Sequence, residues 1–289
     1  MKIGAVITHF NASSTIERAI LSALNQQVPF DKILLVDDHS NINEFEKVST
    51  ICEKYANISL IRNSSNKGYA YCLNKGVDKL DCEYIFVLDD DDESLPWRSQ
   101  KQLELLLEGA DLVYASRLVN KDGLITFNKT VDFNFLQPVE KGVPELLFTG
   151  RYRNQNMLGE FGSCTLAFRR ENFIQLKGFD SQFRRKAEWD FVIRCALAKN
   201  RITSIQMPCI MQYKTEGVKT EKGILISTQM DKQLLSKHYD VLKKRHIYHL
   251  AKAYLNANRF KFYKRPIAFL ASYITLRFLR VCAYTINKL

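Results

Sequence analysis

The chain lacks several features that define other classes of protein. Its seven cysteines are an odd number, lie far apart and include no Cys-x-x-Cys pair. This argues against a disulfide framework and a thiolate zinc site, and it fits a reducing, cytosolic environment best. No run of 18 apolar residues occurs, and the apolar start at residues 3–7 is too short for a secretory signal. Neither a transmembrane helix nor a signal peptide is therefore predicted.

Acidic residues are absent from the end of the chain. Residues 241–289 hold eleven Lys or Arg and no Asp or Glu, whereas the first 240 residues carry 31 of each sign. The net charge of +11 therefore lies wholly in the C-terminal segment. A charge this polarised indicates an anionic partner, either a membrane surface or a nucleic acid.

The first hundred residues alternate short apolar runs with amphipathic stretches. The apolar runs predict strands at Ile3–Ile7, Ile33–Val36, Ile58–Arg62 and Tyr84–Leu88. The stretches between them predict helices over Thr15–Asn25, with Ser13 or Ser14 as N-cap, Phe45–Tyr55 and Tyr69–Leu80. Strands that alternate with helices imply parallel pairing, so the predicted fold is a doubly wound, mostly parallel α/β sheet.

The rest of the chain has a weaker pattern. A hairpin turn is expected at residues 120–123, a strand at Ile205–Tyr213, and helix from Ile226 to the end with an interruption at residues 264–266. We therefore expect a domain at 1–225 and a helical, basic extension at 226–289. Apolar residues dominate from 267 to 286, and Arg277 and Arg280 fall on one arc. Such a helix suits the headgroup region of an anionic membrane, or it packs on the domain with its arginines exposed.

Polar residues follow each of the four predicted strands. They occupy residues 8–11, 37–40, 63–67 and 89–92. In a parallel sheet, ligands bind in the crevice beyond the carboxyl ends of the strands. The sequence therefore predicts a binding site at this edge.

The strongest chemical signal is the run of four aspartates at residues 89–92. Adjacent carboxylates repel one another unless a cation neutralises them. Mg²⁺ and Mn²⁺ prefer carboxylate and phosphate oxygens, so the run predicts a metal–diphosphate site. The alternative is a solvated acidic turn; the second carboxylate pair at Asp37 and Asp38, also at a strand end, favours the metal site.

Four blocks of the sequence, residues 5–11, 19–27, 34–40 and 84–92, resemble the successive blocks of family 2 glycosyltransferases. The resemblance covers about residues 1–220 and implies the GT-A fold. It also implies an inverting enzyme that moves a sugar from a nucleotide-diphosphate donor, commonly a UDP-sugar, with the help of Mn²⁺ or Mg²⁺. The acceptor would be a lipid-linked or cell-surface glycan precursor, as in bacterial polysaccharide biosynthesis, at the cytosolic face of the membrane.

The resemblance assigns roles to residues of the nucleotide site. Thr8 and Phe10 would line the base pocket, with the Phe10 ring against the base. Asp38 would hydrogen-bond the base, and Asp90 would lie near the ribose. His39 stands where the family often has glycine.

The resemblance also assigns the diphosphate side. Asp91 would ligate the metal, with Asp89 or Asp92 beside it, although four adjacent aspartates leave this register open by one residue. Many relatives have an arginine in the helix that follows the third strand, where this chain reads Cys72-Leu73-Asn74. Lys67 is the nearest candidate for a compensating cation; otherwise it is a solvated lysine.

The acceptor-side segment of the family resembles residues 186–194. Its catalytic base aligns with Glu188, where Asp is commoner, and the usual Glu-Asp pair reads Ala187-Glu188. Inversion needs one carboxylate that deprotonates the acceptor hydroxyl. Asp190 is the rival base, or else it braces the helix. Trp189 would lie on the same side, and Lys214 would close over the diphosphate.

Two other functions compete with this interpretation. Nucleotidyltransferases also use aspartates on an α/β sheet, but they typically have a glycine-rich loop after the first strand, where this chain reads Thr8-His9-Phe10-Asn11. A nucleic-acid-binding protein could use residues 241–289 and a degenerate front domain. Carboxylates at all the expected strand ends argue against it, so we expect no nucleic-acid partner.

Overall fold

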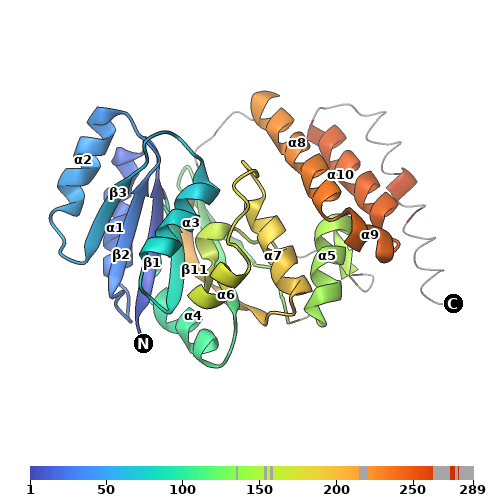
Figure 1. Cartoon of the computed structure of the whole chain (residues 1–289), viewed down its shortest axis with the longest axis horizontal. Coiled ribbons are helices and arrows are strands. Elements are labelled where there is room, and N and C mark those ends of the chain that lie inside the picture. The colour runs from blue at the N-terminus through green and yellow to red at the C-terminus, as the bar shows by residue number, and fades with distance from the viewer. Residues whose placement is uncertain are drawn as a thin grey trace. The chain divides into compact units, whose positions relative to one another are not determined.

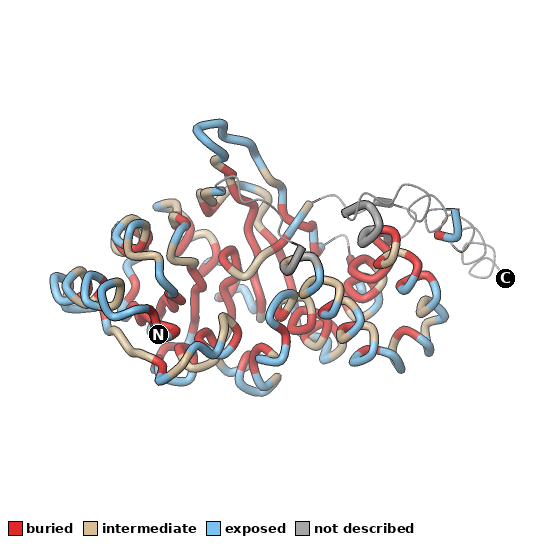
Figure 2. The backbone as a smooth tube through the Cα atoms, turned by 90° about the horizontal axis from the view of Figure 1, so that it is seen from above, coloured by how far each residue is buried: buried red, intermediate tan, exposed pale blue. Residues whose placement is uncertain are grey.

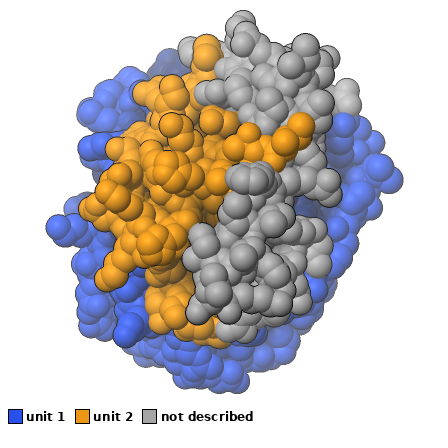
Figure 3. Space-filling view, turned by 90° about the vertical axis from the view of Figure 1, so that its right-hand side faces the viewer, with its two compact units in different colours: residues 1–135, 158–217 blue, residues 136–157, 218–289 orange. Residues whose placement is uncertain are grey.

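The computed structural model describes residues 1–134, 136–152, 155–156, 159–214, 221–262, 274–276 and 279. The chain forms two compact units, coloured separately in Figure 3. Unit 1 comprises residues 1–135 and 158–217, and unit 2 comprises residues 136–157 and 218–289. Unit 2 thus includes an internal segment, 136–157, that the expected C-terminal extension at 226–289 did not contain.

Unit 1 is built on a nine-stranded sheet, of which Figure 1 labels β1, β2, β3 and β11. The strand order is β3-β2-β1-β4-β10-β6-β11-β5, and β7 pairs with β6. Neighbours among β1 to β4 are parallel, β10 runs antiparallel between β4 and β6, and β6 and β11 are parallel. The predicted, mostly parallel α/β sheet is confirmed. The strands are β1 (Ile3–His9), β2 (Lys32–Asp37), β3 (Ile58–Arg62), β4 (Tyr84–Asp89), β5 (Glu93–Ser94), β6 (Leu112–Lys121), β7 (Leu124–Asn128), β10 (Ala167–Arg169) and β11 (Ile202–Lys214).

The helices of unit 1 connect these strands. They are α1 (Ser13–Leu24), α2 (Ile42–Cys52), α3 (Tyr69–Lys79), α4 (Arg98–Leu107), the 3₁₀ turn η1 (Ser163–Thr165), α6 (Arg170–Gln175) and α7 (Ala187–Leu197). The first three agree with the prediction to within three residues at each end. The prediction that Ser13 or Ser14 caps α1 is wrong, because the helix follows Ala12 and has no side-chain cap. Instead, the carboxylate of Glu44, in α2, accepts a hydrogen bond from the Ser13 N–H at 2.9 Å, so this backbone donor at the start of α1 is paired.

The core of unit 1 lies along the central strands, where buried residues line the sheet (Figure 2). All seven residues of β1 are buried. A strand that is buried on both faces reads as a continuous apolar run, which is why the sequence predicted it well. Helix α3 packs so closely that a Cβ on Gly76 would lie 2.5 Å from Val6, so this position requires glycine.

Unit 2 is mainly helical, with α5 (Val139–Thr149), α8 (Glu221–Lys237), α9 (Tyr239–Lys244), α10 (Tyr248–Phe262) and the small strand pair β8 (Arg151–Tyr152) and β9 (Gln155–Asn156). Helix beyond Ile226 is confirmed to Phe262, apart from short breaks. Residues 264–266 and most of 267–286, including Arg277 and Arg280, lie outside the described residues. Among the described helices, none has the length and apolar character needed to span a bilayer.

Candidate functional site

The strand register brings the predicted polar residues to one edge of the sheet. Thr8 pairs with Val36 of β2 on one side and with Asp89 of β4 on the other. His9 pairs with Asp37 at the next position. The strand ends at residues 8–11, 37–40 and 89–92 therefore meet, as the sequence predicted.

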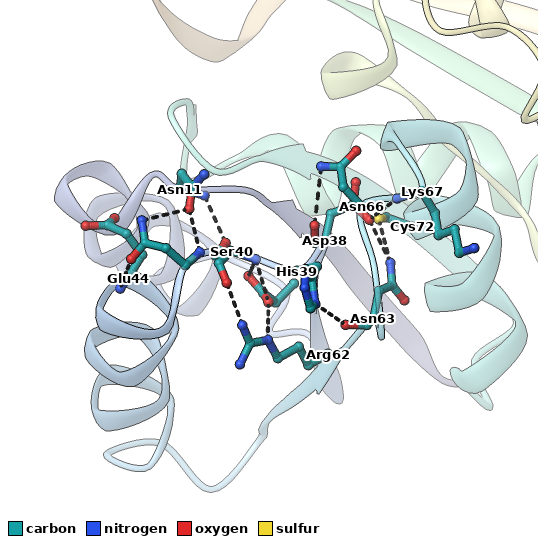
Figure 4. A network of polar contacts seen from close by, with 12 residues as sticks. Asn11, Asp38, His39, Ser40, Glu44, Arg62, Asn63, Asn66, Lys67 and Cys72 are labelled. Carbon is teal, nitrogen blue, oxygen red and sulfur yellow. Dashed lines mark hydrogen bonds and ion pairs between the residues drawn. The ribbon is translucent and has the colours of Figure 1, made fainter.

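Asp38 organises one side of this edge (Figure 4). Its side chain is buried, and it accepts hydrogen bonds from Asn63 Nδ2 at 2.9 Å and from the backbone N–H groups of Lys67 and Gly68 at 2.8 and 2.7 Å. Burial raises the pKa of Asp38, but these hydrogen bonds outweigh it and the net shift of the pKa is downward. An ionised Asp38 thus holds the loop before α3, while the Lys67 side chain is exposed and extends away from it.

His39, next to it, has a backbone φ of +65°. This left-handed conformation favours glycine, the residue that the family resemblance led us to expect at this position. The His39 ring Nδ1 lies 3.2 Å from the Asn63 carbonyl oxygen (Figure 4). Histidine in place of the expected glycine therefore keeps the left-handed turn and adds an imidazole ring next to the Asn63 carbonyl.

Phe10 and Asp90 lie beside each other at the end of β1. The Phe10 ring is 48% exposed, which is unusual for a large apolar side chain and leaves its face available for stacking. The Asp90 carboxylate accepts the Phe10 N–H at 3.2 Å and lies 3.0 Å from Nδ1 of His9, which is buried. Sequence reasoning missed His9, although a histidine at the end of a buried strand was a signal that it could have used.

The aspartate run places its four side chains in different surroundings. Asp91 is exposed, whereas Asp89 Oδ1 and Asp92 Oδ2 are buried without a hydrogen-bond partner among the described residues. One ligand atom from each of Asp89, Asp92 and Cys164 lies within 4.8 Å of the others. Burial and then the neighbouring carboxylates raise the pKa of Asp89 well above its usual value. Burial and then Asp91 raise the pKa of Asp92 to about 7.

These residues fit a hard divalent cation. Two unpartnered, buried carboxylate oxygens with raised pKa values are electrostatically unfavourable alone and are the donors that Mg²⁺ and Mn²⁺ prefer. Burial, followed by the charge of Asp89, raises the pKa of the Cys164 thiol, so it stays protonated and is a poor ligand for such an ion. Asp89 and Asp92 are therefore the two residues whose oxygens could hold the metal together, whereas Asp91, the ligand that the resemblance implied, is exposed and lies outside this cluster.

Two arginines that the sequence analysis missed lie near these carboxylates. Arg98 is 1% exposed and donates to Gln102 Oε1 and to the Val87 carbonyl, both at 2.8 Å. Burial lowers its pKa to about 10, while its charge interacts with those of Asp89 and Asp92. Arg117 of β6 is 6% exposed and pairs with Glu160 at 2.7 Å, and its charge offsets a small part of the rise that burial and Asp91 cause in the pKa of Asp92. The guanidinium groups of Arg98 and Arg117 therefore interact electrostatically with the buried aspartates.

A third arginine ties the aspartate run to the end of β11. The Arg18 guanidinium lies 3.7 Å from the centre of the Tyr213 ring, donates to the Asp91 carbonyl and pairs with Glu93 at 3.3 Å. The Tyr213 hydroxyl donates to Glu93 at 2.7 Å, and its N–H donates to Asp92 Oδ1 at 3.1 Å. Lys214, whose side chain is exposed, follows directly.

Glu188 lies in the first turn of α7 and is half-buried. Burial raises its pKa, and its charge interacts with the buried Tyr69 hydroxyl, which also interacts with the charge of Asp89. The charges of Glu188 and Asp89 thus both act on the Tyr69 hydroxyl. Trp189 stacks on Phe161, with ring centres 6.1 Å apart.

Asp190, two positions further along α7, is fully buried. It accepts a hydrogen bond from Arg194 Nε at 2.8 Å, and Arg194 also donates to the carbonyls of Leu176 and Gly178. This pairing joins α7 to the turn after α6. It supports the bracing role for Asp190 that the sequence left open against the role of base.

Comparison with known proteins bears on much of unit 1. The family model described as "Glycosyl transferase family 2" matches residues 5–176. The chain is 27% identical over 240 residues to the amylovoran biosynthesis glycosyltransferase AmsB of Erwinia amylovora, covering 76% of this chain and 75% of that one. It is 28% identical over 123 residues to a GalNAc(5)-diNAcBac-PP-undecaprenol beta-1,3-glucosyltransferase of Campylobacter jejuni, covering 42% of this chain and 40% of that one.

A solved structure shows the same fold. The crystal structure of S. aureus TarS 1–349 in complex with UDP-GlcNAc matches with a TM-score of 0.61 at 16% identity, covering 91% of this chain and 73% of that one. The chain spans 55% of the length of another curated glycosyltransferase that it matches. The predicted GT-A architecture is confirmed.

Proposed function

The chain belongs to glycosyl transferase family 2, and on that premise we propose that it is an inverting enzyme that transfers a sugar from a UDP-sugar to a hydroxyl of a glycan precursor. The observation that supports this most is that Phe10 and the aspartate run lie together at one edge of the sheet, while the charge of Glu188 acts on the same buried Tyr69 hydroxyl as the charge of Asp89. An exposed ring, carboxylates for a metal and a carboxylate of raised pKa are the parts that such a reaction needs.

The nucleotide would lie along the ends of β1 and β2. The exposed Phe10 ring would stack on the base, with Thr8 lining the pocket and Asp90 near the ribose. Asp38 would accept a base N–H while its carboxylate also holds the Lys67–Gly68 backbone. Preorganisation of this loop would lower the entropic cost of binding the base.

The diphosphate would lie over the aspartate run. Asp91 and Asp89 would hold the divalent cation, with Asp92 beside them, and the cation when bound would neutralise charge on the diphosphate. Arg117 supplies buried positive charge on the same side, and the exposed Lys67 and Lys214 would supply more. The Arg18–Glu93–Tyr213 contacts would keep the end of β11, and hence Lys214, next to the diphosphate.

Glu188 would act as the general base. The acceptor oxygen attacks the anomeric carbon on the face opposite the diphosphate, the carbon–oxygen bond to the diphosphate breaks with its electron pair, and the acceptor proton passes to Glu188. A pKa raised by burial makes Glu188 a stronger proton acceptor than an exposed glutamate. Trp189, held against Phe161, and the buried Asp190–Arg194 pair would fix the first turn of α7 on the acceptor side.

The acceptor would be lipid-linked or part of a surface polysaccharide, and the enzyme would work at the cytosolic face of the membrane. The Erwinia relative is named for amylovoran biosynthesis, and the name of the Campylobacter relative contains an undecaprenol-linked glycan. The eleven basic residues of 241–289 would supply attraction to anionic lipids.

A donor screen tests the proposal. The full chain is incubated with a panel of nucleotide sugars and Mn²⁺, and release of the nucleotide diphosphate is measured with and without EDTA. We expect one UDP-sugar to be turned over in a metal-dependent way, and we expect Glu188→Gln to reduce the rate. Turnover of no donor in the panel, with the protein folded and binding UDP, would contradict the assignment of the donor.

A further inference from the structure

The β6–β7 hairpin carries the densest group of exposed apolar side chains in the described part of the chain. Leu124, Ile125 and Phe127 are 69%, 52% and 54% exposed. Other large exposed hydrophobic side chains among the described residues, such as Ile42 and Leu107, stand singly. Single exposed hydrophobic residues are normal, whereas three within four positions at the tip of one hairpin need an explanation.

The sheet register places this hairpin beyond the aspartate edge. Ala167 of β10 pairs with Phe86 of β4 and with Val113 of β6, so these two positions are level in the sheet. Because β4 and β6 run in the same direction, Ser116 is level with Asp89, the last residue of β4, three residues further on. The hairpin residues 118–128 continue past that point, so they project from the same edge as the proposed catalytic site.

Each face of β7 carries at least one exposed apolar side chain. Successive side chains of a strand point to opposite faces, so Leu124 lies on one face and Ile125 and Phe127 lie on the other. In the part of the chain that the structure describes, β7 pairs with β6 alone. A protein surface packed on the hairpin would cover one face and leave the other in water, whereas a lipid layer surrounds both.

The charges around the apolar tip complement an anionic surface. Lys121 and Lys129 are exposed at the two ends of the tip, and Lys214 pairs with Lys121 in the register of β6 and β11. Asp122 is the one acidic residue between 121 and 129. Apolar side chains flanked by lysines match a bilayer in which acyl chains lie beneath anionic headgroups.

We propose that the tip of the β6–β7 hairpin, residues 121–129, inserts into the headgroup region of an anionic membrane and so holds the catalytic edge at the bilayer. This rests on the proposed function in one respect, namely that the acceptor is tethered to a lipid. It adds a membrane contact within unit 1 that is separate from the basic segment 241–289. The hairpin would then orient the site, while the basic segment would add long-range attraction.

The test compares two triple variants of the full chain. Leu124→Ser, Ile125→Ser and Phe127→Ser together remove the apolar tip. Ile42→Ser, Leu107→Ser and Ile174→Ser remove three side chains of similar exposure on α2, α4 and α6. Binding to vesicles of phosphatidylglycerol and phosphatidylcholine is measured by sedimentation, and donor hydrolysis and melting temperature are measured without vesicles.

We expect the hairpin variant to bind vesicles at least about tenfold more weakly, because burial of each exposed apolar side chain in lipid contributes free energy of binding. The control variant should bind vesicles as the parent does. Donor hydrolysis without vesicles should be equal in the parent and in both triple variants. This measurement shows whether the proposed enzyme activity fails, independently of vesicle binding. Equal vesicle binding by the hairpin variant and the parent would overturn the proposal. So would a change of oligomeric state in the hairpin variant with vesicle binding unchanged, since β7 would then join two copies of the chain.

A second variant does not depend on losing binding. Phe127→Trp adds a tryptophan at the tip to the two native ones, Trp97 and Trp189. Lipids brominated near the headgroup should quench the added fluorescence, seen as the difference from the parent. Absence of additional quenching in vesicle-bound protein would overturn insertion of the tip.

Discussion

At the scale of single residues, the aspartate run shows how neighbours in sequence acquire different chemistry. Asp89 and Asp92 turn inward with unpartnered oxygens, Asp90 is held by His9 and Phe10, and Asp91 faces solvent. The sequence predicted a metal site here because four adjacent carboxylates repel one another. It could not assign the register, since the direction of each side chain in the turn after β4 depends on backbone angles that the residue types leave open.

The metal assignment predicts the effect of Asp91→Ala. Turnover and the metal-dependent part of the affinity for UDP should be lost, because the affinity for the metal should fall by roughly 10–100-fold or more. The free energy of unfolding without metal should be unchanged or higher, because repulsion between the carboxylates is relieved. Titration calorimetry with UDP, with Mn²⁺ or with EDTA, measures the first effect, and thermal unfolding measures the second. Asp78→Ala, an exposed aspartate on α3, is the control. Full activity of Asp91→Ala, or of the parent in excess EDTA, would refute the assignment.

The base assignment predicts both a rate and a pH dependence. Glu188→Gln keeps the size of the side chain but cannot accept a proton, so kcat should fall by roughly 10²–10⁴ with donor binding nearly unchanged. Burial raises the pKa of Glu188 above 4.5, so kcat of the parent should fall as the pH drops through that raised value. This inflection should disappear in Glu188→Gln. By linkage, the ionisation of Glu188 also lowers the free energy of unfolding as the pH rises from 4.5 through the raised pKa.

Asp190→Asn separates the two candidate bases. It weakens a buried pair with Arg194, so we expect a loss of about 1–3 kcal/mol in the free energy of unfolding and a small change in kcat for the protein that remains folded. Thermal unfolding and kcat measured on the same sample distinguish these effects. A large fall in kcat for Asp190→Asn at unchanged stability, with Glu188→Gln active, would reverse the two roles.

At the scale of helices and strands, local pattern predicted the first half of the sheet and long-range pairing completed it. The strands and helices from Ile3 to Asp89 follow from apolar periodicity, because β1, β2 and β4 are buried on both faces. The antiparallel insertion of β10 between β4 and β6 has no such signal. It is the reason why Cys164, about seventy residues after the aspartate run, lies beside Asp89 and Asp92. Arg98 was missed for a related reason, since its burial depends on the Val87 and Leu166 carbonyls.

The contacts between α1 and the end of β11 predict a role for Arg18 in positioning. Arg18→Met keeps the apolar stem but removes the charge that stacks on Tyr213 and binds Glu93 and the Asp91 carbonyl. We expect kcat/KM for the donor to fall roughly tenfold, as for a loss of 1–2 kcal/mol, and faster hydrogen exchange at the Tyr213 amide. Arg18→Lys should restore little, because an ammonium group lacks the planar fork.

Lys79→Met, which removes an exposed cation at the end of α3, is the matched control and should change neither quantity. If Arg18→Met lowers the melting temperature but leaves kcat/KM and the Tyr213 exchange rate unchanged, the contact serves stability alone. The exchange measurement is needed because loss of stability by itself could lower activity in a steady-state assay.

At the scale of the whole molecule, charge is separated along the chain. The first 240 residues are neutral, and residues 241–289 hold all of the excess positive charge. Net charge governs non-specific association and says nothing about fold. The same sequence feature therefore left two interpretations open, a membrane surface or a nucleic acid, and the lipid-linked acceptor that we propose favours the membrane.

Deletion of residues 265–289 tests the membrane interpretation of the basic segment. Four Lys or Arg residues are removed, and each contributes about 1 kcal/mol near an anionic surface within a Debye length, so their loss should weaken vesicle binding by a large factor at low salt. Donor hydrolysis should persist, because no residue proposed for the site lies beyond Lys214. Vesicle sedimentation across a salt series measures the first effect, and nucleotide release measures the second.

Unfolding of the truncated protein would show that residues 265–289 pack in the core of the protein. Tight, steeply salt-dependent binding of the full chain to nucleic acid, with no binding to anionic vesicles, would show that the basic segment has the other partner.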